Sequence, residues 1–349
     1  MAILKRGGKA ANTVVGLDID PGHLAAAEVH VNGSISVTRG AVAPLRPGVL
    51  RDGEVTDGPA LTEALKALWA EHGLPQRVRV GIANQRIVVR TLDLPPLTDE
   101  KAIATAVKVE APDHIPMPID EAVLDYQSLG LVDTPGGQRT RVVVVAVRRE
   151  MVERYAEAIR AAGLKIEGVD LSAFALVRAM GGSENDAGVL YVHAAGLTNV
   201  AVASGSHCLF TRAAGGGLDT VVQTLADRRG LTHEHADQWM KHVGLETPLD
   251  QVEGDPEVVA ATRAALEEGV HQLADTVRNS LNFYRMQQNS ETVSRAVLTG
   301  PATQIPGFAA AFATALGMPV DAGVVGHADG TVDASRLAIA AGLAVESVE

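Results

Sequence analysis

The chain contains the run Arg90-Thr-Leu-Asp-Leu-Pro-Pro-Leu97, then Glu110-Ala-Pro-Asp-His-Ile-Pro-Met-Pro118, and then Asp125-Tyr-Gln127. Consecutive prolines end the first run as a strand, because proline has no amide hydrogen for a sheet ladder. Thr98 and the two acidic residues after it have the pattern of a helix start, and Pro112 is expected to end that helix. These segments predict a strand, a helix and a strand joined by stiff, extended connections.

A strand, a small-residue turn and a second strand occur at two places in the sequence. Thr13–Ile19 is followed by Leu24–Val31, and much later Val189–His193 is followed by Asn199–Ala203. The short glycine-rich stretch 181–186 separates the two halves. This repetition predicts a duplicated fold of two lobes, each built from a sheet and the helices that cover it.

The composition limits the class of protein. The 349 residues are 46% hydrophobic, which is enough for two or three packed lobes. The net charge of −12 repels nucleic-acid backbones and anionic membrane surfaces, so neither is expected as a direct partner. A single cysteine, Cys208, favours a reducing compartment. Because no run of 18 apolar residues occurs, we expect a cytoplasmic protein that reaches a membrane only through partners.

The opening runs, together with Val145-Ala-Val-Arg148 and Gly168-Val-Asp170, resemble the PilM family of type IV pilus assembly proteins. These are actin-like proteins related to the cell-division protein FtsA. The resemblance extends from about Val14 to the C-terminus and is most specific from Leu92 to Gln127. It implies an α/β, actin-like (ribonuclease H-like, duplicated) two-lobed fold with an inserted small α/β subdomain.

On this resemblance the chain divides into four segments. Residues 1–79 are expected to form the first part of lobe 1, and residues 80–168 an inserted subdomain of three or four strands and two helices. Residues 169–185 supply a lobe 1 helix and the boundary between lobes. Residues 186–349 form lobe 2, with a helical subdomain at about 216–290 and a last helix that returns to lobe 1.

The resemblance also implies a function. Members of the family are cytoplasmic, lie at the inner face of the cell membrane, and hold the short N-terminal tail of the membrane protein PilN. Many bind ATP between the two lobes. We therefore expect a pilus assembly scaffold whose partners are a PilN-like tail and other pilus assembly proteins, with ATP and Mg²⁺ as candidate ligands.

The first hairpin departs from the phosphate-binding pattern that the family implies. Gly16 and Asp18 match its opening, Asp18 is the candidate Mg²⁺ ligand, and Gly22 is kept. The expected glycine and hydroxyl residues are replaced at Asp20 and Pro21. Proline removes an amide donor, and Asp20 places negative charge where a phosphate would lie.

The second hairpin is better kept but lacks an acid. Gly196, Thr198 and Asn199 are candidate nucleotide-binding residues, whereas the family's aspartate falls on Val192 or His193. Without that carboxylate an attacking water loses its usual orienting group, so no catalytic residue is assigned and hydrolysis is not expected.

The other nucleotide-binding candidates lie later in the chain. They are Gly215, Gly216, Gly217, Asp237, Lys241, Gly300, Ala302 and Thr303. Together with the hairpins they imply a degenerate ATP cleft. The alternative interpretation is that Asp18, Gly22 and Gly196 are ordinary turn residues.

The partner groove is expected where the inserted subdomain meets the first lobe. Its candidate residues are Leu94, Pro95, Leu97, Ile115 and Met117. These residues could equally serve to pack the subdomain onto its neighbour. Two other functions stay open: an active ATPase of pilus assembly that hydrolyses Mg-ATP, and an FtsA-like protein that binds membrane itself. The second would need an amphipathic C-terminal tail, whereas Ala341–Glu349 ends in acidic residues.

Overall fold

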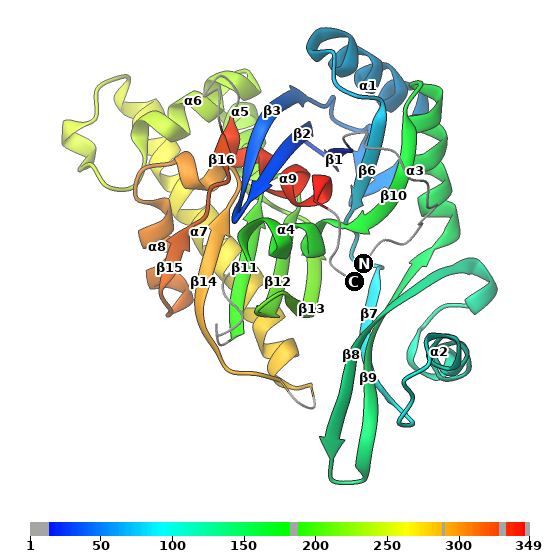
Figure 1. The fold of residues 1–349 in the computed structure, drawn as a ribbon. Coiled ribbons are helices and arrows are strands. Elements are labelled where there is room, and N and C mark those ends of the chain that lie inside the picture. The colour runs from blue at the N-terminus through cyan, green and yellow to red at the C-terminus, as the bar shows by residue number, and fades with distance from the viewer. Residues whose placement is uncertain (1–13, 182–187, 288–289, 328–332, 346–349) are drawn as a thin grey trace.

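The computed structural model describes residues 14–181, 188–287, 290–327 and 333–345. Two large sheets lie side by side, and a third, three-stranded sheet projects from them (Figure 1). Helices cover the large sheets, and one helix, α2 (Glu100–His114), covers the third. Among the described residues, no helix is long and apolar enough to span a membrane.

The first large sheet has six strands in the order β10-β6-β1-β2-β3-β16. Their bounds are β1 Val15–Asp20, β2 His23–Asn32, β3 Ser34–Pro44, β6 Arg77–Ile82, β10 Lys165–Leu171 and β16 Gly326–His327. Strands β1, β2 and β3 are antiparallel, while β6 and β10 continue the sheet in parallel. A hairpin turn at Gly33 joins β2 to β3, with Asn32 paired to Ser34.

Helices α1 (Gly58–His72) and α3 (Arg149–Ala161) complete the core of this first lobe. Leu61 and Leu65 from α1 and Tyr155 and Ile159 from α3 are buried there. A short hairpin, β4 (Leu50–Arg51) and β5 (Glu54–Val55), precedes α1.

The second large sheet has five strands in the order β13-β12-β11-β14-β15. Their bounds are β11 Gly188–Ala194, β12 Thr198–Ser204, β13 His207–Ala214, β14 Val293–Thr299 and β15 Val320–Ala322. It is covered by helices α5 Leu218–Arg229, α6 His233–Val243, α7 Pro256–Arg285 and α8 Phe308–Leu316. Helix α7 is capped by Asp255, whose side chain accepts hydrogen bonds from the amides of Glu257 and Val258.

Helices α4 (Ser172–Met180) and α9 (Ala338–Ala344) lie between the two large sheets (Figure 1). The last helix, α9, packs against β1 and β2 of the first sheet and against α4. Gly16 permits this close approach, since a Cβ atom there would lie 1.8 Å from the carbonyl oxygen of Ala340.

The third sheet has the order β7-β9-β8, with β7 Val88–Leu94, β8 Ala122–Thr134 and β9 Gly137–Arg148. One of its faces packs on α2, where Leu92, Ile103 and Val144 are buried together. The segment with its own sheet and core therefore runs from β7 to β9.

This segment is shorter than the predicted insertion, 80–168, and it contains one α-helix rather than two, with a short 3-10 helix at Ile119–Glu121. Strands β6 and β10, at the two ends of the prediction, pair with each other in the first large sheet. Helix α3 also belongs to that lobe, because its apolar face is buried in the lobe 1 core. Helix α2 begins after Asp99, which caps it in place of Thr98, and it continues past Pro112.

Candidate functional site

The carboxylate of Asp20 bridges the two lobes. Its Oδ1 atom accepts hydrogen bonds from the backbone amides of Gly196, at 2.9 Å, and of Gly22, at 3.1 Å. Its Oδ2 atom accepts the amide of Leu197 at 3.0 Å. Asp20 ends β1, whereas Gly196 and Leu197 form the turn between β11 and β12. The turn amides that would face a phosphate therefore already hold an anion from the same chain.

A buried ion pair also crosses the cleft. Arg336, in the short 3-10 helix Ala334–Leu337, donates from Nη2 to Oδ1 of Asp219 at 3.0 Å and from Nη1 to Oδ2 at 3.3 Å. The same Nη1 lies 3.1 Å from Nδ1 of His23. The side chains of Arg336 and Asp219 are only 13% and 8% exposed. Neutralisation by Asp219 allows the guanidinium to stay buried.

Two carboxyl groups on β1 differ in their charge. Burial raises the pKa of Asp18 to about 7, with His23 opposing and Asp20 adding to the shift. Asp20 is buried too, yet His23 and the amides of Gly22 and Leu197 outweigh burial and hold the pKa of Asp20 below its ordinary value. Asp20 is therefore ionised at neutral pH, while Asp18 carries a proton in a large fraction of molecules.

His193 stands at one of the positions where the family's aspartate is expected. Its Nδ1 atom lies 2.9 Å from the hydroxyl oxygen of Thr299, and the ring is 1% exposed. Burial, with a smaller contribution from His23, lowers the pKa of His193 to about 4. The ring is therefore neutral at pH 7, and this position offers no negative charge.

The cleft also contains a cluster with metal-ligating side chains. Asp20, His23 and Asp219 offer ligand atoms within 4.8 Å of one another. Arg336 already contacts His23 and Asp219, so its guanidinium supplies positive charge to this cluster. A metal ion bound by these three residues would have to displace that guanidinium.

The family model for the type IV pilus assembly protein PilM matches residues 16–348. The chain belongs to this family. A solved structure described as a PilM-PilN type IV pilus biogenesis complex is similar, with 25% identity and a TM-score of 0.76, covering 96% of this chain and 98% of that chain. The resemblance inferred from the sequence is thereby confirmed.

More distant structures show the same actin-like fold. The ethanolamine utilization protein EutJ from Carboxydothermus hydrogenoformans is 16% identical with a TM-score of 0.54, over 97% of this chain and 92% of that one. MreB5 of Spiroplasma citri, solved with ADP, is 11% identical with a TM-score of 0.51, over 95% of each chain. The predicted fold class is confirmed.

In this PilM-family chain, the predicted glycine segments of lobe 2 meet at the turn that holds Asp20. Gly217 fits closely there, because a Cβ atom would lie 2.0 Å from the carbonyl oxygen of Ala195. Gly300 lies against Ala194, and Thr303 closes its loop by donating to the Gly300 carbonyl at 2.8 Å. Gly215, Gly216 and Ala302, which were also predicted to bind nucleotide, are the sequence neighbours of these residues. Gly217 and Gly300 thus pack against Ala194 and Ala195, where the turn begins.

Two other predicted residues pair with each other. Lys241 and Asp237 form an ion pair of 2.8 Å on α6, with side chains 32% and 21% exposed.

Thr198, another predicted nucleotide-binding residue, is fully buried, and its hydroxyl has no hydrogen-bond partner among the described residues.

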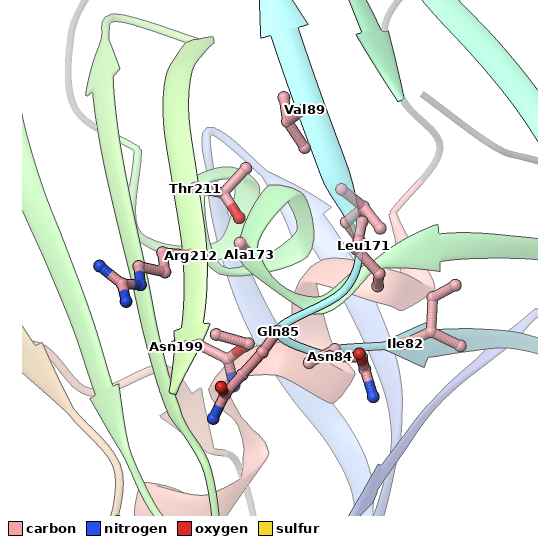
Figure 2. A pocket seen from close by; sticks show the side chains of 12 residues that line it. Ile82, Asn84, Gln85, Val89, Leu171, Ala173, Asn199, Thr211 and Arg212 are labelled. Carbon is pink, nitrogen blue, oxygen red and sulfur yellow. The ribbon is translucent and has the colours of Figure 1, made fainter. Parts of the chain in front are cut away.

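Asn199 lines a small cavity between the lobes, shown in Figure 2. Asn84 and Gln85 lie at the same end of it, and Val89 and Leu171 lie further along. Its volume is about 50 Å³, which is room for a few water molecules and far less than a nucleotide needs.

The predicted groove residues do not form one surface. Leu94 and Ile115 are buried in the core of the third sheet and α2, so neither can contact a partner. Leu97 is partly buried, and its backbone bonds to the Thr140 hydroxyl. Pro95 is exposed, and Met117 lines a cavity that opens towards lobe 2. Leu94 and Ile115 pack inside the inserted segment itself, so neither the groove nor the alternative of packing onto the neighbouring lobe describes these two residues.

Arg336 and Asp219 are cleft residues that the sequence did not reveal. Asp219 follows the triple glycine in the first turn of α5, where an acid is ordinary for helix starts. Arg336 has no motif around it, and only the fold brings it to His23, which is 313 positions away.

Proposed function

We propose that this chain is a cytoplasmic, actin-like scaffold of type IV pilus assembly whose cleft is closed by its own side chains. The observation that carries the proposal is the Asp20 carboxylate on the amides of Gly196 and Leu197. Phosphate binding at such a turn needs those amides free. The Arg336–Asp219 pair adds a second contact across the cleft. Both contacts support a closed form that requires no nucleotide.

The chemistry of the cleft also argues against ATP turnover. His193 is neutral and buried, and Asp18 is a candidate Mg²⁺ ligand whose pKa of about 7 disfavours its charged form. Hydrolysis of ATP needs a group that orients water and a carboxylate or hydroxyl that holds Mg²⁺. ATP is therefore expected to bind weakly or not at all in the protein as it stands.

The partner in this proposal is the short N-terminal tail of a PilN-like membrane protein. The 25% identity to the chain of a PilM-PilN complex over nearly the full length supports it. Binding such a tail would hold the scaffold at the inner face of the cell membrane, beside other pilus assembly proteins. The net charge of −12 gives no attraction to anionic lipid, so attachment is through the partner.

Steady-state phosphate release with ATP and Mg²⁺ tests the cleft. The proposal expects release no faster than from a protein-free control. Turnover of about 1 s⁻¹, the lower range of ordinary enzymes, would contradict the closed cleft and favour the active ATPase.

Fluorescence titration with the labelled tail peptide of the PilN-like protein from the same source tests the partner. A scrambled peptide of the same composition is the control. We expect saturable binding of the tail and none of the scrambled peptide. No saturation up to about 100 μM, equivalent to about −5.5 kcal/mol, would contradict the scaffold function.

A further inference from the structure

The tip of the β4–β5 hairpin is a tight two-residue turn. Arg51 pairs with Glu54 across it, and the two residues between them, Asp52 and Gly53, have φ values of 51° and 77°. Two positive φ values in a row are typical of a type I′ turn, whose twist matches that of the flanking strands. At the base of the hairpin, Leu50 is buried in the lobe 1 core. The tip is therefore a compact structure that is anchored in lobe 1.

This tip meets lobe 2 at two points. A Cβ atom on Gly53 would lie 3.4 Å from Cδ1 of Leu197, and a Cβ atom on Gly215 would lie 3.4 Å from Oδ1 of Asp52. Leu197 is 4% exposed, and its backbone amide donates to Oδ2 of Asp20 at 3.0 Å. Lobe 1 therefore contacts Leu197 twice, at the backbone through Asp20 and at the side chain through the hairpin tip.

Two buried side chains fix the backbone of the tip. The hydroxyl of Tyr155 on α3 donates to the carbonyl oxygen of Gly53 at 2.9 Å, and Nδ2 of Asn84 donates to the carbonyl oxygen of Asp52 at 2.7 Å. Tyr155 is 1% exposed and Asn84 is 5% exposed. A carbonyl group that is shielded from water costs free energy when it loses its donor. These two hydrogen bonds therefore resist movement of the tip.

The tip is also fixed to the connection between β6 and the inserted segment. A Cβ atom on Gly53 would lie 1.8 Å from the carbonyl oxygen of Ala83, and Arg86 pairs with Glu54 at 2.9 Å. Asn84 belongs to the same connection and lines the small cavity between the lobes (Figure 2). The hairpin therefore contacts lobe 1, lobe 2 and the start of the inserted segment.

We propose that the β4–β5 hairpin is a strut that keeps the cleft closed, with Tyr155 and Asn84 as its positioning residues. The strut contacts the side chain of Leu197, while Asp20 holds the amide of the same residue. Without the strut, the turn of lobe 2 is held from one side alone and opens more often. This inference rests on the closed cleft proposed above and adds an element that maintains it. Because the hairpin also contacts the start of the inserted segment, it connects that segment to the cleft.

Hydrogen exchange at the amides of Gly196 and Leu197, measured by NMR on the nucleotide-free chain, tests the strut. Hydrogen-bonded amides exchange when the structure around them opens. Tyr155→Phe keeps the ring and removes only the hydrogen bond to the tip. We expect both amides to exchange about twofold to tenfold faster in this variant, which is the range for the loss of one hydrogen bond.

The matched control is Tyr284→Phe. It removes a hydroxyl that accepts the amide of Glu291 at 2.8 Å, near the end of α7. Each of the two variants loses one tyrosine hydroxyl, so a general loss of stability would speed exchange in both. The strut predicts faster exchange at Gly196 in Tyr155→Phe alone.

Two further variants remove other contacts of the strut. Leu197→Ala shortens the side chain that meets the tip, and Asn84→Ala removes the donor to Asp52. Each is expected to speed exchange at Gly196 at least twofold. Circular dichroism and thermal unfolding verify that every variant is folded.

Two results would overturn the strut: unchanged exchange at Gly196 in Tyr155→Phe, or equal acceleration in Tyr284→Phe. Exchange of this amide in the natural chain as fast as in an unfolded chain would contradict both the strut and the closed cleft. Neither ATP turnover nor binding of the tail peptide enters the measurement, so a failure of the strut is distinguishable from a failure of the scaffold function.

Discussion

The Oδ1 atom of Asp20 accepts a hydrogen bond from the backbone amide of Gly196 at 2.9 Å, across 176 positions of sequence and from one lobe to the other. Each residue belongs to one of the two strand–turn–strand units that the fold repeats. A carboxylate that accepts several backbone amides is satisfied without a cation or a ligand. The two lobes of this PilM-family chain are therefore joined directly by hydrogen bonds between their own residues.

The Arg336–Asp219 pair is expected to matter for stability because both groups are buried. Arg336→Met leaves Asp219 as an uncompensated buried charge, which typically costs about 3–5 kcal/mol of unfolding free energy. Arg336→Met/Asp219→Asn removes both charges and should lose clearly less. Urea unfolding of the two variants measures the difference, and equal losses would contradict the coupling.

An exposed pair supplies the control for that experiment. Arg228 lies 3.9 Å from Glu268, and the two side chains are 64% and 55% exposed. Arg228→Met should cost less than about 1 kcal/mol, because solvent screens such pairs.

Asp18 gives a pH dependence whose direction follows from its raised pKa. The folded pKa is about 7 and the model-compound value is 3.8, so the folded state binds the proton more tightly. Its contribution to stability is present below pH 4 and is lost as pH rises to about 7. Asp18→Asn keeps the shape without the charge. We expect the variant to gain stability over the natural chain between pH 4.5 and 8, by up to about 4 kcal/mol.

The comparison must use the difference between the two proteins at each pH. The pKa of His193 is lowered to about 4, so that residue stabilises the fold as pH rises through the same range and partly hides the effect of Asp18. Thermal unfolding midpoints of both proteins at several pH values provide the measurement. A difference that does not change with pH would show that Asp18 is ionised in the fold.

The close packing of the last helix, α9, against β1 can be tested by a substitution at Gly16. Gly16→Ala would place Cβ 1.8 Å from the Ala340 carbonyl oxygen, so α9 must move. We expect a loss of about 1–3 kcal/mol or more, seen as a lower thermal midpoint. Gly58→Ala, at the start of α1 with no atom within 4 Å of the new Cβ, is the control and should be nearly neutral. Equal midpoints for the two variants would contradict the close packing of α9.

Local sequence patterns predicted the individual elements well. The strands predicted at Leu24–Val31 and Asn199–Ala203 lie in β2 and β12, because runs of β-branched and apolar residues favour a strand through local preference alone. The extent of the inserted segment was wrong because β6 and β10 pair across more than eighty positions of sequence. Such pairing leaves no local mark on either strand.

In the candidate site, too, features that depend on local sequence were predictable and contacts between distant residues were not. Asp20 was visible as an acid in place of a glycine or hydroxyl residue, and its negative charge was the reason to predict weak phosphate binding. Its amide partners across the cleft were not visible, nor was Arg336. Leu94 and Ile115 were assigned to a groove because proline-flanked apolar residues can be exposed, but the third sheet and α2 enclose them.

Titration calorimetry with ATP and Mg²⁺ on the natural chain and on Asp20→Gly shows whether the Asp20 carboxylate closes the phosphate site. We expect no saturable heat from the natural chain up to about 1 mM ATP, equivalent to about −4.1 kcal/mol. We expect measurable binding by Asp20→Gly, because the amides of Gly196 and Leu197 are then free for a phosphate. Binding of ATP by the natural chain at about 1 μM, unchanged in the variant, would contradict this closure.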